Sequence, residues 1–556
     1  MATASITNAD LVTQGRGSVV RRGPTPDSCV LALADSLADV TDLLGFRPSD
    51  VTAGSAGQVS SLTRSPTIVL EGVASDGDLI YLSETVSGAG SNVPSSEVTV
   101  LLGTAYHVYE QSGTWYAELI PNVKIFAPTG FITRWTVAGD AAARTITLPL
   151  VNTRFEGPLA YNCTVDWGDG SPTSTVTAYN DPDRIHTYAA DGTYDVEIRG
   201  VCEGWSFTIA SDRLKITAIV NWGSKSLFDG FAYLLAGFAG CTNLTSLGRG
   251  TIPASGSGIG VNGFNSTFTL CDIITIPVGL FKQHAAVTSD AYRACFNGCS
   301  ALTSIPPDLF KQGTSASNNV FDGTFEDCIS LTSIPTDLFR HNTAVSDLAF
   351  SSVFSGCTSL TSIPDDLFRY NTLAGDQSFN SVFSGCSSLV AIPVDLFRYN
   401  TLVSGSAFER AFADCASLVT VPADLFRYNT LVGALGFHST FENCTSLATV
   451  PADLFRYNTV STTEVFKATF SGCTKLQLNR NIFYADGEEA TRFLNQSPNF
   501  SSCFDRASFT GTQGEAPDLW NCSYGTGTPV KTSCFGGGGN SLTSLSNYGD
   551  IPAAWK

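Results

Sequence analysis

The stretch that decides the fold reads Phe350-Ser-Ser-Val-Phe-Ser-Gly-Cys357-Thr-Ser-Leu-Thr-Ser-Ile-Pro364-Asp-Asp-Leu-Phe-Arg-Tyr-Asn371. The same pattern recurs before and after it, and its cysteine returns every 29 residues from Cys299 to Cys473. A period of this length is typical of a solenoid, in which each repeat buries its apolar face only against its neighbours. The repeats therefore predict a stack of about eleven turns, and a stack more often displays a surface than encloses a reaction.

One cysteine per repeat marks the register of this stack. The equivalent residues, each placed between a Phe and a Leu, are Cys299, Cys328, Cys357, Cys386, Cys415, Cys444 and Cys473. We interpret them as a ladder of small buried thiols, because free cysteine is among the most buried residue types. No C-x-x-C pair occurs and histidine is present five times, so neither a metal site nor a cofactor is expected.

Within a repeat, Leu360-Thr-Ser-Ile363 alternates apolar and polar residues, which predicts a short strand in a parallel ladder. Pro364 cannot donate to that ladder and suits the first turn of a helix, so a short helix is expected after it. Phe350 and Phe354, four residues apart, predict a second short helix with one apolar stripe. The repeat is thus expected to be α/β.

The candidate binding residues form an edge of alternating aromatic and amide side chains after the first predicted helix. They are Tyr370, Asn371, Tyr399, Asn400, Tyr428, Asn429, Tyr457 and Asn458. Flat apolar rings beside hydrogen-bonding amides suit a face that binds sugar or protein. The structural alternative is that each Asn caps its helix and each Tyr packs on its copy in the next repeat. The loops that follow vary between repeats, and recognition is also expected there.

Composition excludes several functions. Charged residues make up 15% of the 556 residues and the net charge is −19, so no basic surface is available for nucleic acid or an anionic membrane. No apolar run is long enough to span a membrane, and the first residues carry no secretory signal pattern. Acidic residues recur in every repeat, whereas an active site should be singular, and no catalytic motif occurs. The chain is therefore expected not to be an enzyme.

Changes of pattern divide the chain into five parts. An N-terminal attachment segment (1–50) is expected to contain one helix, from Ser28 to Leu44. A small β domain (51–125), a second β domain (126–203), the repeats (204–535) and a tail (536–556) follow. The fold class is multidomain and mostly β.

Two motifs in the second β domain resemble a known family. Val165-Asp-Trp-Gly-Asp-Gly-Ser171 and His186-Thr-Tyr-Ala-Ala-Asp-Gly-Thr-Tyr194 are similar to the signature of PKD-type Ig-like domains. The repeats that follow, beginning with Phe238-Ala-Gly-Cys241, resemble BspA-type leucine-rich repeats of bacterial surface and phage proteins. The resemblance implies an Ig-like β-sandwich followed by a leucine-rich-repeat-like solenoid. The repeat of 29 residues is longer than the usual BspA-type repeat.

These observations predict a non-enzymatic phage virion protein, a tail or capsid fibre or spike that contacts a host surface protein or polysaccharide. Residues 1–125 would join it to other virion proteins, with a homo-oligomer as an open option. Its location would be the virion surface. Two alternatives remain: a bacterial cell-surface adhesin of the BspA-like type, and a purely architectural capsid decoration protein.

Overall fold

The computed structural model forms two compact units, Met1–Gly130 with Gly223–Phe228 and Phe131–Trp222 with Asp229–Lys556. Up to residue 126 it describes the backbone of nine strands. Beyond these it describes residues 129–154, 157–208, 211–248, 250–254, 262–284, 289–307, 309–311, 318–459, 464–505, 513–536 and 542–556.

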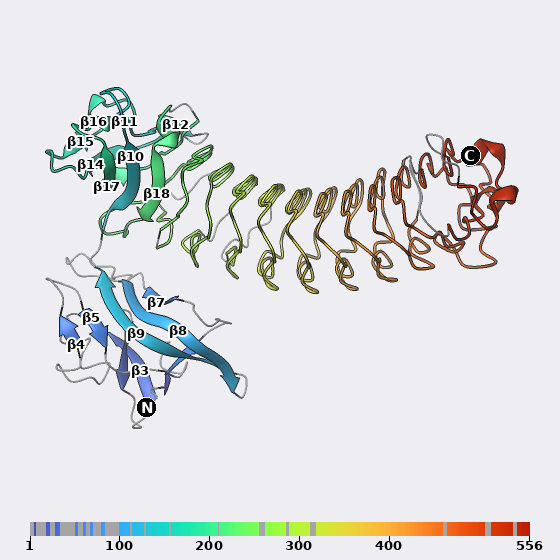
Figure 1. Ribbon diagram of the computed structural model, residues 1–556, viewed down its shortest axis with the longest axis horizontal. Helices are drawn as coiled ribbons and strands as arrows, with labels where there is room; N and C mark the ends of the chain where they lie inside the picture. The colour runs from blue at the N-terminus through green and yellow to red at the C-terminus, as the bar shows by residue number, and fades with distance from the viewer. Residues whose placement is uncertain are drawn as a thin grey trace. The chain divides into compact units, whose positions relative to one another are not determined.

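The described part of the first unit consists of strands (Figure 1). One sheet has the order β1-β3-β2, and a larger antiparallel sheet has the order β6-β9-β8-β7, while β4 pairs with β5. The bounds are β1 Ser5–Ile6, β2 Ser18–Arg22, β3 Ser28–Leu33, β4 Val51–Ala53, β5 Val59–Leu62, β6 Thr67–Leu70, β7 Leu79–Ser83, β8 Thr99–Gln111 and β9 Thr114–Phe126.

Strand β3 corrects the expectation of a helix from residue 28 to residue 44. Its residues Ser28–Leu33 pair with β2 in antiparallel register, Val20 opposite Leu31. A short apolar run fits a buried strand as well as a helix, and the presence of a partner strand decides between them. The remainder of that segment lies outside the described residues.

The second unit begins with a five-stranded sheet in the order β15-β14-β17-β10-β18, antiparallel throughout. Two shorter ladders accompany it, β11 with β16 and β12 with β13. The bounds are β10 Phe131–Val137, β11 Thr145–Thr147, β12 Thr153–Arg154, β13 Gly157–Pro158, β14 Tyr161–Asp166, β15 Ser174–Val176, β16 Ile185–Thr187, β17 Gly192–Cys202 and β18 Ile216–Asn221.

The motif residues of this sheet form one packed cluster. Trp167 is buried, and the His186 ring stacks on it at 4.8 Å. His186 Nε2 lies 2.8 Å from the Asp169 carboxylate, and the Tyr188 hydroxyl donates to the carbonyl of Trp167. The neighbouring hydrogen bonds to Ser171 and His186 lower the pKa of Asp169 to about 2 despite its partial desolvation, so the carboxylate is ionised and holds the imidazole in place.

Strand β18 joins the sheet to the repeats. It is the edge strand of the five-stranded sheet, antiparallel to β10, and on its other side Ala218 forms a parallel bridge with Ser246 of the first repeat. The backbone N–H of Ile219 donates to Ser246 O at 2.9 Å. Trp222 packs against Phe238 below this junction. The sheet therefore covers the first repeat, which would otherwise expose its apolar end.

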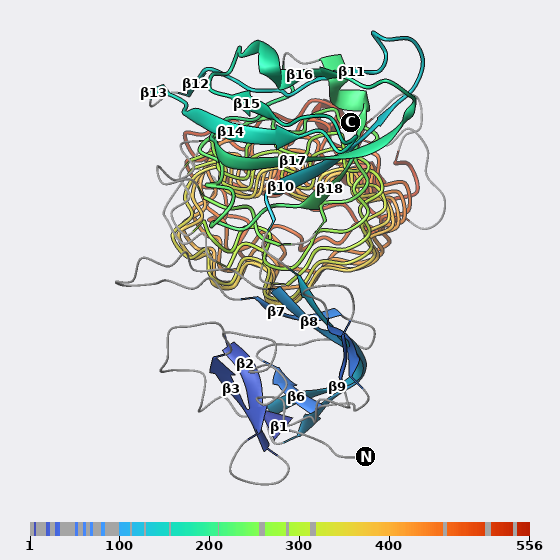
Figure 2. The same cartoon turned by 90° about the vertical axis from the view of Figure 1, so that its left-hand side faces the viewer.

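The repeats lie side by side in one series, and seen end-on they nearly superimpose (Figures 1 and 2). Isolated parallel bridges join consecutive repeats at one exposed residue each, such as Ala391 to Thr420 and Thr420 to Thr449. The helices among the described residues are short 3-10 helices. They are η3 Pro182–Arg184, η4 Ser211–Leu214, η5 Leu519–Asn521, η6 Tyr548–Asp550 and η7 Ala553–Trp555.

Neither predicted helix of the repeat forms; the described residues there are turns. We call the segment 348–357 and its equivalents the turn ribbon. Along it, successive backbone N–H groups donate alternately to a carbonyl of their own repeat and to a carbonyl of the next repeat. Val353 donates to Phe350 O within the repeat, whereas Phe354 donates to Val382 O of the next. Ser352 has a φ of 51° and Gly356 a φ of 72°, values that an α-helix excludes. The ribbon thus satisfies its backbone partly between repeats, where a helix would do so internally.

Three phenylalanine ladders run through the core of the repeats. Ring centroids of equivalent residues lie 5.9 Å apart for Phe350 and Phe379, 5.8 Å for Phe354 and Phe383, and 6.2 Å for Phe368 and Phe397. All of these rings are buried. Because each aromatic ring removes a large apolar area from water only when both neighbours are present, the stability of the stack resides in contacts between repeats.

Candidate functional site

The cysteine ladder occupies the interior. The fifteen cysteines whose side chains the structure describes are buried and unpaired, Cys299 to Cys473 among them. The thiol of Cys357 donates to Phe325 O of the preceding repeat at 3.2 Å, and Cys386 donates to Phe354 O at the same distance. Burial raises the pKa of Cys299 to about 12. These thiols are protonated hydrogen-bond donors that link consecutive repeats.

The asparagines of the predicted binding edge are interior residues, which corrects their assignment to a binding face. Asn371, Asn400 and Asn429 are 0% exposed and Asn458 is 1% exposed. Asn400 Nδ2 donates to Phe368 O at 3.1 Å and to Asn371 O at 2.9 Å. The amide is turned inward because two carbonyls of the preceding repeat need a donor there.

Asn371, Asn400, Asn429 and Asn458 form an asparagine ladder, and at each end of it a different side chain donates to the backbone carbonyls. At its C-terminal end Arg492 donates to Phe455 O at 2.7 Å and to Asn458 O at 2.8 Å. Burial lowers the pKa of Arg492 to about 10. Toward the N-terminal end His284 occupies the equivalent place and its Nε2 lies 2.9 Å from Ile252 O. Burial also lowers the pKa of this imidazole to about 4, so it is neutral and donates from Nε2.

The tyrosines of the predicted edge do lie at the surface. Tyr370, Tyr428 and Tyr457 are 36–39% exposed, and Tyr399 is half-buried. Arginines lie over their rings: Arg369 is 5.8 Å from the Tyr370 centroid and 5.4 Å from that of Tyr399. A sugar would need the ring faces that the guanidinium groups cover, so the stripe is a poor stacking platform.

Each of these arginines also pairs with a carboxylate of its own repeat, for example Arg369 with Asp366 at 3.3 Å and Arg398 with Asp395 at 3.2 Å. The edge is therefore an Asp–Arg–Tyr ladder that neutralises its own charge. Exposed ion pairs of this kind contribute little stability individually. Within each such pair the carboxylate and the guanidinium offset each other's charge.

The variable loops present an apolar row beside this ladder. Leu373, Leu402 and Leu431 are 52%, 59% and 67% exposed. The loop backbone is tied to the preceding repeat, since Asp376 N–H donates to Asp347 Oδ1 at 2.9 Å.

The repeat pattern breaks after Cys473. Here Gln477-Leu-Asn-Arg-Asn-Ile-Phe-Tyr484 stands in place of the usual Ile-Pro-x-Asp-Leu-Phe-Arg segment. The stretch between the cysteine and the proline position is one residue shorter than in the regular repeats. Asn479 stands where the other repeats have proline, and Tyr484 stands where they have arginine. The next strand-like segment follows much later: Leu478 bridges Gly514, and Glu515 N–H donates to Leu478 O at 3.1 Å.

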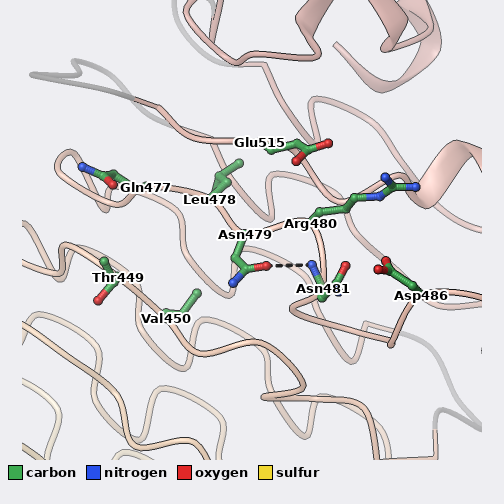
Figure 3. A pocket seen from close by; sticks show the side chains of 9 residues that line it. All are labelled: Thr449, Val450, Gln477, Leu478, Asn479, Arg480, Asn481, Asp486 and Glu515. Atoms are coloured by element: carbon green, nitrogen blue, oxygen red, sulfur yellow. Dashed lines mark hydrogen bonds between the residues drawn. The ribbon is translucent and has the colours of Figure 1, made fainter.

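This break forms a pocket with a volume of about 540 Å³ (Figure 3). One part of the lining comes from Thr449 and Val450 of the last regular repeat, and the rest comes from the irregular segment and Glu515. The lining residues are Thr449, Val450, Gln477, Leu478, Asn479, Arg480, Asn481, Asp486 and Glu515. The volume is within the range of small-molecule sites, and most lining side chains are polar.

Arg480 is the cation among these nine residues. Figure 3 shows its side chain between Glu515 and Asp486. Its Nη2 lies 3.0 Å from Asp518 Oδ2, and Asp518 accepts a further hydrogen bond from Asn547. The carboxylate of Asp518, with smaller contributions from Glu515 and Asp486, raises the pKa of Arg480. Among the described residues neither Asp486 nor Glu515 has an ion pair, and Arg480 pairs with Asp518, so carboxylates outnumber the cation in and around the pocket.

Sequence reasoning missed this pocket. The available signal was the loss of proline at Asn479 and of the basic residue at Tyr484, after seven repeats that keep both the proline and a basic residue there. That signal marks an irregular repeat, but it does not reveal that Glu515 lies beside it.

Within the described ranges, no group of three or more His, Cys, Asp or Glu side chains could hold a metal ion. In the same ranges no helix has the length and apolar character needed to cross a membrane.

The chain matches no protein-family model and no curated protein. Among solved structures it is similar to a leucine-rich repeat protein from Bacteroides ovatus ATCC 8483, with 17% sequence identity and a TM-score of 0.22. That match covers 61% of this chain and 93% of the other.

Proposed function

We propose that this chain is a non-enzymatic adhesion protein of a phage virion, a tail or capsid fibre or spike. In this proposal an Ig-like, PKD-type sandwich leads into a leucine-rich-repeat-like solenoid, and residues 1–125 attach the protein to the particle. The solenoid carries its recognition site to a host polysaccharide or surface protein.

The observation that carries the proposal is the contrast between the regular repeats and the pocket. Along the repeats, the Cys357 thiol and the Asn400 Nδ2 donate to backbone carbonyls of the preceding repeat, and Arg369 pairs with a carboxylate of its own repeat. Such a stack is suited to a rigid arm. The pocket around Arg480 is polar, concave and carries carboxylates that the repeat does not explain. We assign recognition to it.

Two carboxylates beside a bound sugar are also what a glycoside hydrolase requires. The adhesion proposal therefore predicts that a bound polysaccharide is recovered uncut. Release of shorter oligosaccharides by the full chain, abolished in Glu515→Gln, would make the protein an enzyme.

The test has two parts. Mass spectrometry of purified virions and of the host cell envelope should find the chain in the virions. The purified full chain, added in excess, should then block adsorption of those virions to host cells. Detection in the cell envelope alone would favour a bacterial adhesin. Presence in virions without any block of adsorption would favour a decoration protein.

A further inference from the structure

We propose that the pocket lined by Arg480, Asp486 and Glu515 binds a sugar unit that carries a protonated amino group. This inference rests on the proposed function and deepens it, because it names the chemical class of the ligand.

The charge of the pocket favours a cationic ligand. Arg480 contributes one positive charge, and its Nη2 lies 3.0 Å from the carboxylate of Asp518, which is 14% exposed. The Nε of Arg480 is buried and has no hydrogen-bond partner among the described residues. Asp486 is exposed and Glu515 is half-buried, and both line the cavity. A ligand with negative charge would meet these carboxylates, and the chain as a whole carries a net charge of −19. Acidic and sulfated polysaccharides are therefore disfavoured, whereas a cationic group is attracted.

The neutral polar groups of the pocket favour a sugar. Thr449, Gln477, Asn479 and Asn481 line the same pocket as the carboxylates and contribute hydroxyl and amide side chains. Asn481 N–H donates to Asn479 Oδ1 at 2.9 Å, which fixes the position of the Asn479 side chain (Figure 3). Asn481 Oδ1 is buried and has no hydrogen-bond partner among the described residues. Several fixed hydrogen-bonding groups in one concavity suit the many hydroxyls of a sugar better than a single extended ammonium side chain.

The backbone of the pocket walls is held in place by hydrogen bonds. Thr449 and Gln477 form a parallel bridge, and Glu515 is held beside them by its backbone bond to Leu478. These groups are therefore positioned before a ligand arrives, which lowers the entropic cost of binding.

The experiment uses the full chain and measures binding of a glucosamine tetramer by titration calorimetry at mildly acidic pH, where the amines are protonated. An N-acetylglucosamine tetramer of the same length and a lysine tetrapeptide serve as comparisons. The amino sugar should bind, and the acetylated tetramer should bind at least about tenfold more weakly, because a charge-assisted hydrogen bond is lost.

The variants Asp486→Asn and Glu515→Gln should each weaken amino-sugar binding about tenfold. The matched control for each is Asp366→Asn, which removes the same single charge from an exposed position on the Asp–Arg–Tyr ladder and should leave binding unchanged. Equal binding of the acetylated tetramer, tighter binding of the lysine peptide, or no effect of the pocket variants would each overturn the inference. If the chain still blocks virion adsorption in that case, the adhesion proposal stands and only the ligand class is wrong.

Discussion

Arg492 Nη2 lies 2.8 Å from the backbone oxygen of Asn458, the place where the next asparagine of the ladder would have put its amide. The same guanidinium also reaches Phe455 O and Phe483 O. Arg492 therefore closes the ladder with donors that reach three carbonyls at once.

This closure predicts a large effect of Arg492→Met. The substitution leaves buried carbonyls without a donor and should lower the free energy of unfolding by about 3 kcal/mol. Thermal unfolding monitored by circular dichroism measures the change. Arg410→Met, at a 41% exposed arginine of the same stack, should cost less than about 1 kcal/mol. Equal effects of the two variants would refute a capping role.

The asparagine ladder predicts that Asn400→Ala destabilises the protein by about 2 kcal/mol, because Phe368 O and Asn371 O each lose one donor. The adjacent Tyr399→Ala should cost about 1 kcal/mol or less, since it removes a partly exposed contact with arginine. Denaturant unfolding of both variants compares them directly. A tyrosine variant that is the less stable of the two would contradict the account.

Because His284 is buried, we expect the free energy of unfolding to depend on pH. Its pKa in the folded protein is about 4, below the ordinary 6.5, so the unfolded chain takes up the proton first as the pH falls. The stabilising contribution is complete above pH 6.5 and is lost between pH 6.5 and about 4, where the loss reaches about 3 kcal/mol.

The matched variant is His284→Asn, which restores the ladder residue and does not titrate. The difference in free energy of unfolding between wild type and variant should change across this pH range. A difference that stays constant from pH 7 to pH 4 would show that the imidazole is not held neutral.

The thiols predict low reactivity. Thiolate is the reactive form, and burial raises the pKa of Cys299 to about 12 and raises that of Cys386 well above its ordinary value. In the native protein an iodoacetamide label should not modify the peptides of Cys299, Cys328, Cys357, Cys386, Cys415, Cys444 or Cys473, whereas all should react in denaturant. Native labelling of these peptides, measured by mass spectrometry, would contradict the interior placement.

The sequence was enough to predict the 29-residue period, the turns that follow one another along the stack, and the interior place of the cysteines. It was misleading for the Phe350 and Phe354 pair, because a spacing of four residues suits both a helix and the turn ribbon. Hydrogen bonds to the next repeat, such as Phe354 N–H to Val382 O, decide between them, and no local pattern reveals such bonds.

The same limit applies to the candidate site. Asn371 beside Tyr370 reads equally well as a cap or as a surface pair, and only the carbonyls of the preceding repeat show which it is. The pocket depends on residues far apart in the chain, with Glu515 placed beside Arg480 by the bond to Leu478. An irregular repeat can be recognised from sequence, but its neighbours in space cannot.

The central claim is that recognition lies in the pocket at the end of the repeats and not along the tyrosine edge. Binding of the labelled full chain to host cells tests it, with the double variant Asp486→Asn, Glu515→Gln compared against Tyr370→Ser, Tyr428→Ser. Both double variants should fold, as judged by their unfolding transitions. The account predicts that the pocket variant loses at least about tenfold in cell binding while the tyrosine variant binds as the wild type does. Loss of binding in the tyrosine variant, with the pocket variant unaffected, would contradict it.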